Sequence, residues 1–448
     1  MAVTLALATA PLACAAKKTL QIAAGFDDTY SAALSQFTRD TGIAVRSEPC
    51  DDVVKRIMNR DQAFDVYRLT SDTNTLTNLL DKGYGVDLSG NEAIQAFAAS
   101  LIPAVAEAVT YDGQIAAVPT DIVFPYVFSF NRTLWADCRL TDDDIPATMT
   151  ELFDFIDQWQ ERYADQYPDV TPFYPFSVGG SHGDRNNPYF GLVMEMYRDS
   201  IIRATGTLTY NTPAFRDLLA RVAPYAEPEN KAANFIHEVP QMQQTLIYCT
   251  SVKMGGMFLR TDHEVIAPPA VIAGSEPFQP FYVQCSFVNP YSSRMDDAKT
   301  LLSYYAQYPN EEVLCELVLN ATPAENASFE ADYQGWVDML KTAQTMLATD
   351  SLSDGERADY ERKEALAQRM VDHPDQYRYG IPPDKVRMYQ QTLVPILWAR
   401  GATVYDTDAL TKQLDNIIAQ YVDGALTADQ FVAQMDHTID MIVLEEGN

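Results

Sequence analysis

The sequence predicts an α/β fold, with strands and helices that alternate along much of the chain. Residues 20–45 read as strand, helix and strand, and a similar strand and helix return after residue 265. From residue 329 onward the pattern is almost wholly helical. Strands that alternate with helices predict a mostly parallel sheet covered by helices on both faces.

The opening unit is supported by its apolar spacing and its turn residues. We expect a strand at 20–24, a turn at 25–28, a short strand at 43–45, and a further strand at 64–69 that leads into a polar loop at 70–75. Gly42 is positioned to end the intervening helix. Apolar side chains of that helix recur at i, i+3, i+4 and i+7, namely Tyr30, Ala33, Leu34 and Phe37.

The later part of the chain also predicts a strand followed by a helix, and the pattern after it is helical. A β-rich run at 281–288 is broken by Asn289 and Pro290, and a helical stripe follows at Ala298, Leu301, Leu302 and Tyr305. Near the end, Gly424 closes a helix whose stripe is Leu410, Leu414, Ile417, Ile418 and Tyr421. Thr427 and Gln430 form a capping box for a last helix that bears Phe431, Met435, Ile439 and Ile442.

Length and charge limit the possible functions. The 448 residues are enough for two or three domains, and 47% apolar content excludes wholesale disorder. The net charge is −30, from 32 basic and 62 acidic residues. Such a charge repels nucleic-acid phosphates and anionic membrane surfaces, so we expect no nucleic acid as a partner. We interpret the acidic surface as a solvated one that maintains solubility, and attraction of cationic ligands is the alternative.

The cysteines and the N-terminal segment bear on where in the cell the protein is located. Cys50, Cys138, Cys249, Cys285 and Cys315 are scattered without metal-ligand spacing, so we expect buried apolar residues rather than a disulfide framework. The first 16 residues are apolar and contain Leu12-Ala13-Cys14, which looks like a secretory signal ending in a lipoprotein cleavage site. Lipid at Cys14 is one expectation, and an ordinary cleaved signal peptide is the alternative.

Residues 113–152 carry four marks in a fixed order. They are Pro119, an apolar β-rich run at 123–130, the turn former Asn131, and Pro146-Ala147-Thr148 before a helix that begins near Glu151. Thr148 or Thr150 can cap that helix. The segment resembles the hinge-entry region of the family 1 extracellular solute-binding proteins, the capture components of ABC importers. The strand at 281–288, Ser292-Ser293, Pro323 and the two closing helices are also similar to that family.

The resemblance implies a periplasmic-binding-protein-like fold of two α/β lobes built from discontinuous segments, with a helical C-terminal extension. After a leader at 1–18, one lobe would comprise 19–123 and 268–321, and the other 124–267 and 322–448. Crossovers would lie near 121–126, 263–269 and 320–326. It further implies a bacterial, extracellular, lipid-anchored monomer that captures a small solute, most consistently a carbohydrate, for a membrane permease. No cofactor is implied.

The resemblance also places certain turn and crossover residues between the lobes. Aromatic rings there would stack on sugar rings, while carboxylates and an arginine fork would hydrogen-bond hydroxyls. For any single ring, ordinary core packing is the alternative. The expected ligand-binding residues are Phe26, Asp27, Asp65, Tyr67, Asp121, Phe124, Tyr126, Phe258 and Arg260. Tyr282 belongs to the same aromatic group, and Asp121 is expected to be an exposed hinge residue.

One motif suggests chemistry. Gly179-Gly-Ser181-His-Gly183 fits the G-x-S-x-G elbow of serine hydrolases, but the loop-forming residues up to Pro188 replace the helix that an elbow requires. We therefore expect no catalytic residue and interpret the loop as a surface loop or a ligand-contacting loop that uses Arg185 and Asn187. A serine hydrolase using Ser181, and a sensor or adhesion module without transport, are the two alternatives.

Metal and nucleotide signatures are weak. Residues 350–361 have the length of a calcium loop, but Leu352 offers no oxygen at the third position, and a helix capped near Ser353 explains the segment better. Gly83-Tyr-Gly85 lacks the third glycine of a dinucleotide loop. The five histidines show no ligand spacing, so we expect no metal site.

Overall fold

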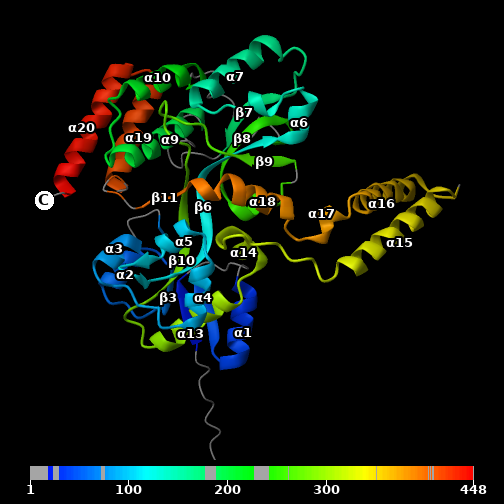
Figure 1. Ribbon diagram of the computed structural model, residues 1–448, viewed down its shortest axis with the longest axis horizontal. Helices are drawn as coiled ribbons and strands as arrows, with labels where there is room; N and C mark the ends of the chain where they lie inside the picture. The colour runs from blue at the N-terminus through cyan, green and yellow to red at the C-terminus, as the bar shows by residue number, and fades with distance from the viewer. Residues whose placement is uncertain are drawn as a thin grey trace, which may run out of the picture.

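The computed structural model describes residues 19–23, 30–71, 76–176, 188–226, 242–260, 262–349, 351–401, 403, 405 and 408–446. Figure 1 shows two lobes, one above the other, with the long strand β6 (Val118–Asn131) between them. A two-helix arm projects to one side. The periplasmic-binding-protein-like fold predicted from the sequence is confirmed.

The N-terminal lobe begins with the predicted strand, helix and strand. These are β1 (Thr19–Ala23), α1 (Ser31–Thr41) and β2 (Ala44–Glu48). Gly42 ends α1 with φ of 68°, a left-handed conformation that favours glycine. The remaining elements of this lobe are α2 (Val53–Met58), β3 (Val66–Thr70), α3 (Leu76–Asp81), α4 (Glu92–Ser100), α5 (Pro103–Ala108), β4 (Thr110–Tyr111), β5 (Gln114–Ile115), β10 (Gln279–Val288), α13 (Met295–Gln307) and α14 (Glu311–Leu317).

The C-terminal lobe follows the end of β6. Thr148 caps α7 in a capping box with Glu151, and Thr427 and Gln430 hydrogen-bond reciprocally, as predicted. Asn131 ends β6 and also caps α6, since its side chain accepts from the Leu134 amide. The elements are α6 (Arg132–Asp137), α7 (Met149–Arg162), β7 (Thr171–Phe176), α9 (Pro188–Thr205), α10 (Pro213–Val222), β8 (Thr245–Lys253), β9 (His263–Ile266), α19 (Asp408–Val422) and α20 (Ala428–Glu446).

One sheet runs through both lobes in the order β2-β1-β3-β10-β6-β8-β7, and β9 and β11 (Leu397–Ala399) pair beside it. The prediction of a mostly parallel sheet is wrong. The crossover strands β6 and β10 pair antiparallel with each other and with β3, β8 and β9, because the chain enters and leaves the second lobe in opposite directions, whereas β10 and β11 pair in parallel. Val123 lies where the main partner of β6 changes from β10 to β8, since it pairs with Tyr282 on β10 and with Lys253 on β8.

Two separate hydrophobic cores support the two lobes. The first is built around β1, β3, β10 and α13, and the second around β6, β7, α7 and α9. Two helices that the sequence analysis assigned to the second lobe contribute to the first core. They are α12 (Met254–Phe258) and α18 (Pro383–Thr392). Four cysteines are buried as predicted, Cys50 is half-buried, and all five are free thiols.

The arm consists of α15 (Phe329–Leu347) and α16 (Asp354–Asp372), which pack side by side and extend away from both lobes (Figure 1). Ser353 caps α16 in a capping box with Glu356, so the capped-helix interpretation of this segment is confirmed. The short α17 (Asp375–Arg378) returns the chain to α18. The helical character was predicted, but the projection was not.

Candidate functional site

A charged cluster lies where β3, β6, β8 and β10 meet. Asp121 accepts hydrogen bonds from the Arg68 guanidinium at 3.4 Å and from the Lys253 ammonium. Arg68 also donates to Gln284 Oε1 at 2.7 Å. We call these four residues the hinge cluster. Asp121 is only 5% exposed, so the expectation that it is an exposed carboxylate is wrong. The neighbouring strands cover it because they continue through the crossover.

A second carboxyl group adjoins the hinge cluster. Glu316 on α14 is buried, and its Oε1 accepts a hydrogen bond from the Gly255 amide. Burial, followed by the negative charge of Asp121, raises the pKa of Glu316 well above its ordinary value. Folding therefore favours the protonated form of Glu316 relative to the unfolded chain.

This raised pKa predicts a pH dependence of stability. A folded-state pKa above the unfolded value contributes stability that is fully present below the unfolded pKa, and that stability is lost as pH rises through the folded pKa. We expect Glu316→Gln, which stays neutral, to lose less stability than the wild type between pH 5 and pH 8. Urea unfolding of both proteins at the two pH values measures this. Parallel losses in the two proteins would contradict it.

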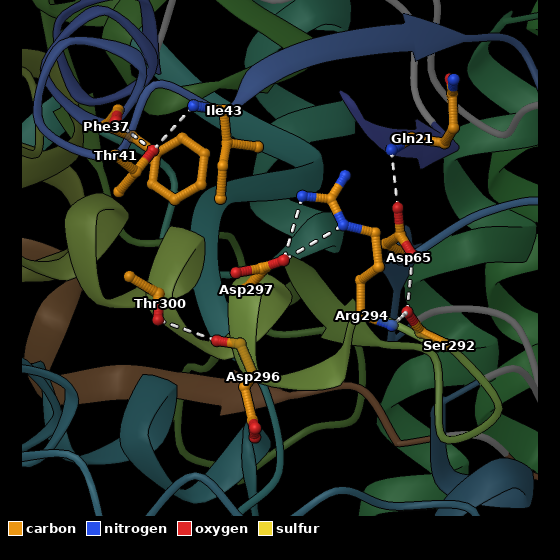
Figure 2. Close-up of polar contacts among 10 residues, drawn as sticks. All are labelled: Gln21, Phe37, Thr41, Ile43, Asp65, Ser292, Arg294, Asp296, Asp297 and Thr300. Carbon is orange, nitrogen blue, oxygen red and sulfur yellow. Dashed lines mark hydrogen bonds and ion pairs between the residues drawn. The ribbon is translucent and has the colours of Figure 1, made fainter. Parts of the chain in front are cut away.

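Asp65 has a structural role in this structure. Figure 2 shows its carboxylate between Gln21 and Ser292. It accepts from the Gln21 amide at 2.8 Å and from Ser292 Oγ at 2.5 Å, and it is 6% exposed. These bonds connect β1 to the turn that follows β10, and Ser292 in turn accepts from the Arg294 amide. We therefore leave Asp65 out of the proposed site.

Four predicted stacking rings lie in the protein interior. Tyr67, Phe124, Tyr126 and Phe258 are each at most 1% exposed, and their rings contact other core side chains. Phe124 and Phe258 both pack edge-on against Tyr389 of α18. The structure thus places these rings in the core, which was the alternative interpretation for each, and we leave them out of the proposed site.

Arg260 lies beside an aromatic group that the sequence analysis did not identify. Its guanidinium is 6.0 Å from the centre of the Tyr248 ring, and burial lowers the pKa of Arg260. The Tyr248 ring in turn contacts Tyr174 and Phe176, with centroids 6.5 and 6.3 Å away. We call Tyr174, Phe176 and Tyr248 the aromatic patch.

Two rings of the aromatic patch, Tyr174 and Phe176, lie at the end of β7, and Tyr248 lies on the neighbouring strand β8. Tyr174 and Phe176 are half-buried and alternate with Phe173, which belongs to the C-terminal core. Because side chains alternate across a strand, this spacing places Tyr174 and Phe176 on the other face of the sheet. The run Phe173-Tyr174-Pro175-Phe176 could have signalled this in the sequence. Residues 177–187, which follow β7 directly, contain Ser181, Arg185 and Asn187.

Some predicted site residues lie outside the described part of the chain. They are Cys14, Phe26, Asp27, Ser181, Arg185 and Asn187. The roles expected for them stay predictions.

A second charged network joins the crossover strands to the C-terminal lobe. Arg400, just after β11, is 5% exposed and lies 2.8 Å from Asp199 of α9. It also contacts Glu195 and the Tyr282 hydroxyl, and its guanidinium lies 5.3 Å from the Tyr282 ring centre. Tyr282 therefore contacts a buried ion network, which we call the Arg400 network.

The described residues contain no group of three or more His, Cys, Asp or Glu side chains arranged to hold a metal ion. Within the same part of the chain, each helix is too short or too polar to cross a membrane.

Comparisons with known proteins agree with this architecture. Residues 32–199 match the family model for the bacterial extracellular solute-binding proteins. No curated protein matches the sequence. The fold is similar to maltose-bound MalE3 of T. maritima, with a TM-score of 0.56 and 11% identity over 95% of this chain and 99% of that one.

Two further solved structures have the same fold. A solute-binding protein from Thermotoga lettingae, bound with alpha-D-tagatose, is 15% identical over 95% of this chain and 100% of that one, with a TM-score of 0.54. One from Agrobacterium radiobacter K84, in complex with ribitol, is 13% identical over 95% and 98%, with a TM-score of 0.55. The chain therefore shares the two-lobe fold of these solved solute-binding proteins, and residues 32–199 are similar to the bacterial extracellular solute-binding family.

Proposed function

We propose that this protein captures a carbohydrate at the aromatic patch and delivers it to the permease of an ABC importer. The aromatic patch beside Arg260 is the observation that carries the proposal. The half-exposed rings of Tyr174 and Phe176, which pack on the buried Tyr248, supply the flat apolar area against which a sugar ring stacks, and the Arg260 guanidinium donates to its hydroxyl groups. The solved relatives bound to maltose, tagatose and ribitol support this ligand class.

The proposed mechanism uses the crossover strands as hinges. Because β6 and β10 take part in the sheet between the two cores, a rotation of one lobe relative to the other bends these strands. Closing on a ligand would remove water from the aromatic patch and strengthen each polar contact there. No chemical reaction is part of this proposal.

Substitution of the aromatic patch tests the proposed site. Tyr174→Ala is expected to weaken binding of the best sugar from a carbohydrate panel by about 1–3 kcal/mol, since the apolar contact of one ring is lost. Tyr308→Ala removes a tyrosine that is 41% exposed at the end of α13 and serves as the control. Isothermal titration calorimetry measures both. Equal affinities of the two variants would place the ligand elsewhere.

We also propose that a lipid at Cys14 holds the protein at the bacterial cell surface. The apolar leader that ends in Leu12-Ala13-Cys14 supports this proposal. Cys14→Ser, expressed behind a complete signal sequence, is expected to move the protein from the membrane fraction into the medium. Immunoblotting of the two fractions measures the shift, and unchanged fractionation would rule out the anchor.

A further inference from the structure

A groove at the base of the α15–α16 arm forms a second candidate binding site. It has a volume of about 460 Å³ and lies at the opposite end of the arm from its tip. Its apolar walls are Phe329, Tyr333, Trp336 and Met339 of α15, Met370 of α16, and Tyr377 of α17. This site is separate from the aromatic patch of the C-terminal lobe.

The groove is lined by residues of α15, α16 and α17 at the base of the arm. Ala343 of α15 is buried further along the arm, with 1% exposure, and Ala367 of α16 is buried near the base, one turn before Met370, with 0% exposure. Nearer the base, Gly335 lines the groove, and a Cβ atom added to it would meet no atom within 4 Å. Glycine in a helix interior costs about 1 kcal/mol relative to alanine. Here it leaves the backbone of α15 open to close approach by another molecule.

The polar groups of the groove are already engaged in local structure. Asp332 accepts from Ser328 Oγ at 2.6 Å, and Asn326 Oδ1 accepts from the amide and hydroxyl of Ser328 at 3.0 and 2.9 Å. The open walls are therefore aromatic rings and the thioethers of Met339 and Met370. Methionine side chains adapt to differently shaped apolar partners, so this lining suits an apolar anchor side chain better than a polyol.

Charge selects the kind of partner. α15 carries three acids, Glu330, Asp332 and Asp338, against a single base, Lys341, and α16 carries six acids against four bases. Arg378 of α17 lies 4.9 Å from the centre of the Phe329 ring, and its charge is paired with Glu325 at 3.5 Å. The whole chain has a net charge of −30, so a second copy of this protein or any acidic partner is repelled. A partner with basic residues around its apolar anchor is attracted instead.

We propose that the groove binds a basic amphipathic helix of another protein. Apolar anchors of that helix would enter between Trp336, Met339 and Met370, while its backbone approaches α15 over Gly335. Its lysines or arginines would face Asp332 and Asp338. Because the arm projects away from both lobes (Figure 1), such a partner can bind whether or not the lobes hold a solute.

A synthetic peptide tests the proposal with two matched variants. The probe is a short helical peptide with leucines and one tryptophan on one face and lysines on the other, labelled with fluorescein. Gly335→Trp fills the groove, whereas Gly355→Trp adds the same ring in α16 at a position that also has open space around its Cβ. Anisotropy titrations are run at 0.15 M salt, where nonspecific attraction to the acidic surface is screened.

We expect Gly335→Trp to weaken peptide binding about tenfold or more and Gly355→Trp to leave it unchanged. Melting curves of both variants confirm that the fold is retained. Equal binding by the two variants, or equal binding of a peptide with glutamates in place of the lysines, would overturn the proposal. A third result would also overturn it: the wild type binds indole but not the peptide, and Gly335→Trp abolishes indole binding. The groove would then be a small-molecule site.

Discussion

Arg400→Ala is expected to lower the free energy of unfolding by about 3–5 kcal/mol. Arg400 and Asp199 are 5% and 0% exposed, so the substitution leaves the Asp199 carboxylate buried without this guanidinium. It also removes contacts with Glu195 and Tyr282, which connect α9 to the crossover strand β10. Urea unfolding followed by circular dichroism measures the loss.

A surface arginine provides the control for this substitution. Arg46 pairs with Glu48 on β2, where the two side chains are 67% and 54% exposed, and exposed ion pairs contribute little to stability. Arg46→Ala should therefore leave the unfolding midpoint nearly unchanged. If the two variants unfold at similar urea concentrations, the Arg400 network does not stabilise the crossover.

Asp121→Ala is expected to destabilise the protein by about 1–3 kcal/mol. The substitution deprives Arg68 and Lys253 of a shared carboxylate, and both cations lie at the point where β6 changes partners. The cost is smaller than for Arg400 because the Arg68 and Lys253 side chains are 21% and 42% exposed, so water partly replaces the lost contact. Unfolding in urea again gives the magnitude.

The same variant has a second readout. Because the charge of Asp121 helps to raise the pKa of Glu316, its removal should bring that pKa closer to the ordinary value. The loss of stability between pH 5 and pH 8 should then be smaller in Asp121→Ala than in the wild type. A steeper pH dependence in the variant would contradict the coupling between these two carboxyl groups.

Local sequence patterns predicted the helix ends and several strands well, because these features depend on short-range interactions. Gly42 ends α1, Thr148 and Ser353 cap α7 and α16, and the strand beginning near residue 20 pairs with the next one. The helix stop and the two helix caps are each decided by residues within about one helical turn. The family resemblance added the connection between the lobes, which no local pattern contains.

The candidate site could be predicted only in part, because burial depends on long-range packing. Phe124 and Tyr126 lie on a crossover, where stacking on a ligand and core packing were both open, and the structure covers the side chains around β6 on both faces. Tyr174 and Phe176 lie in an aromatic run at the end of a strand in the second lobe, but that run does not indicate which ring they contact. Their contact with Tyr248 depends on the pairing of β7 with β8, whose register the sequence does not reveal.

Small-angle scattering combined with calorimetry tests the central claim most directly. Purified protein is titrated with a panel of mono- and oligosaccharides, polyamines and peptides, and scattering is recorded with and without the tightest ligand. The proposed function predicts that the tightest ligand is a carbohydrate and that it reduces the radius of gyration, as the lobes close around it. A tightest ligand of another class, no binding to any carbohydrate, or binding of a carbohydrate without compaction would contradict the account.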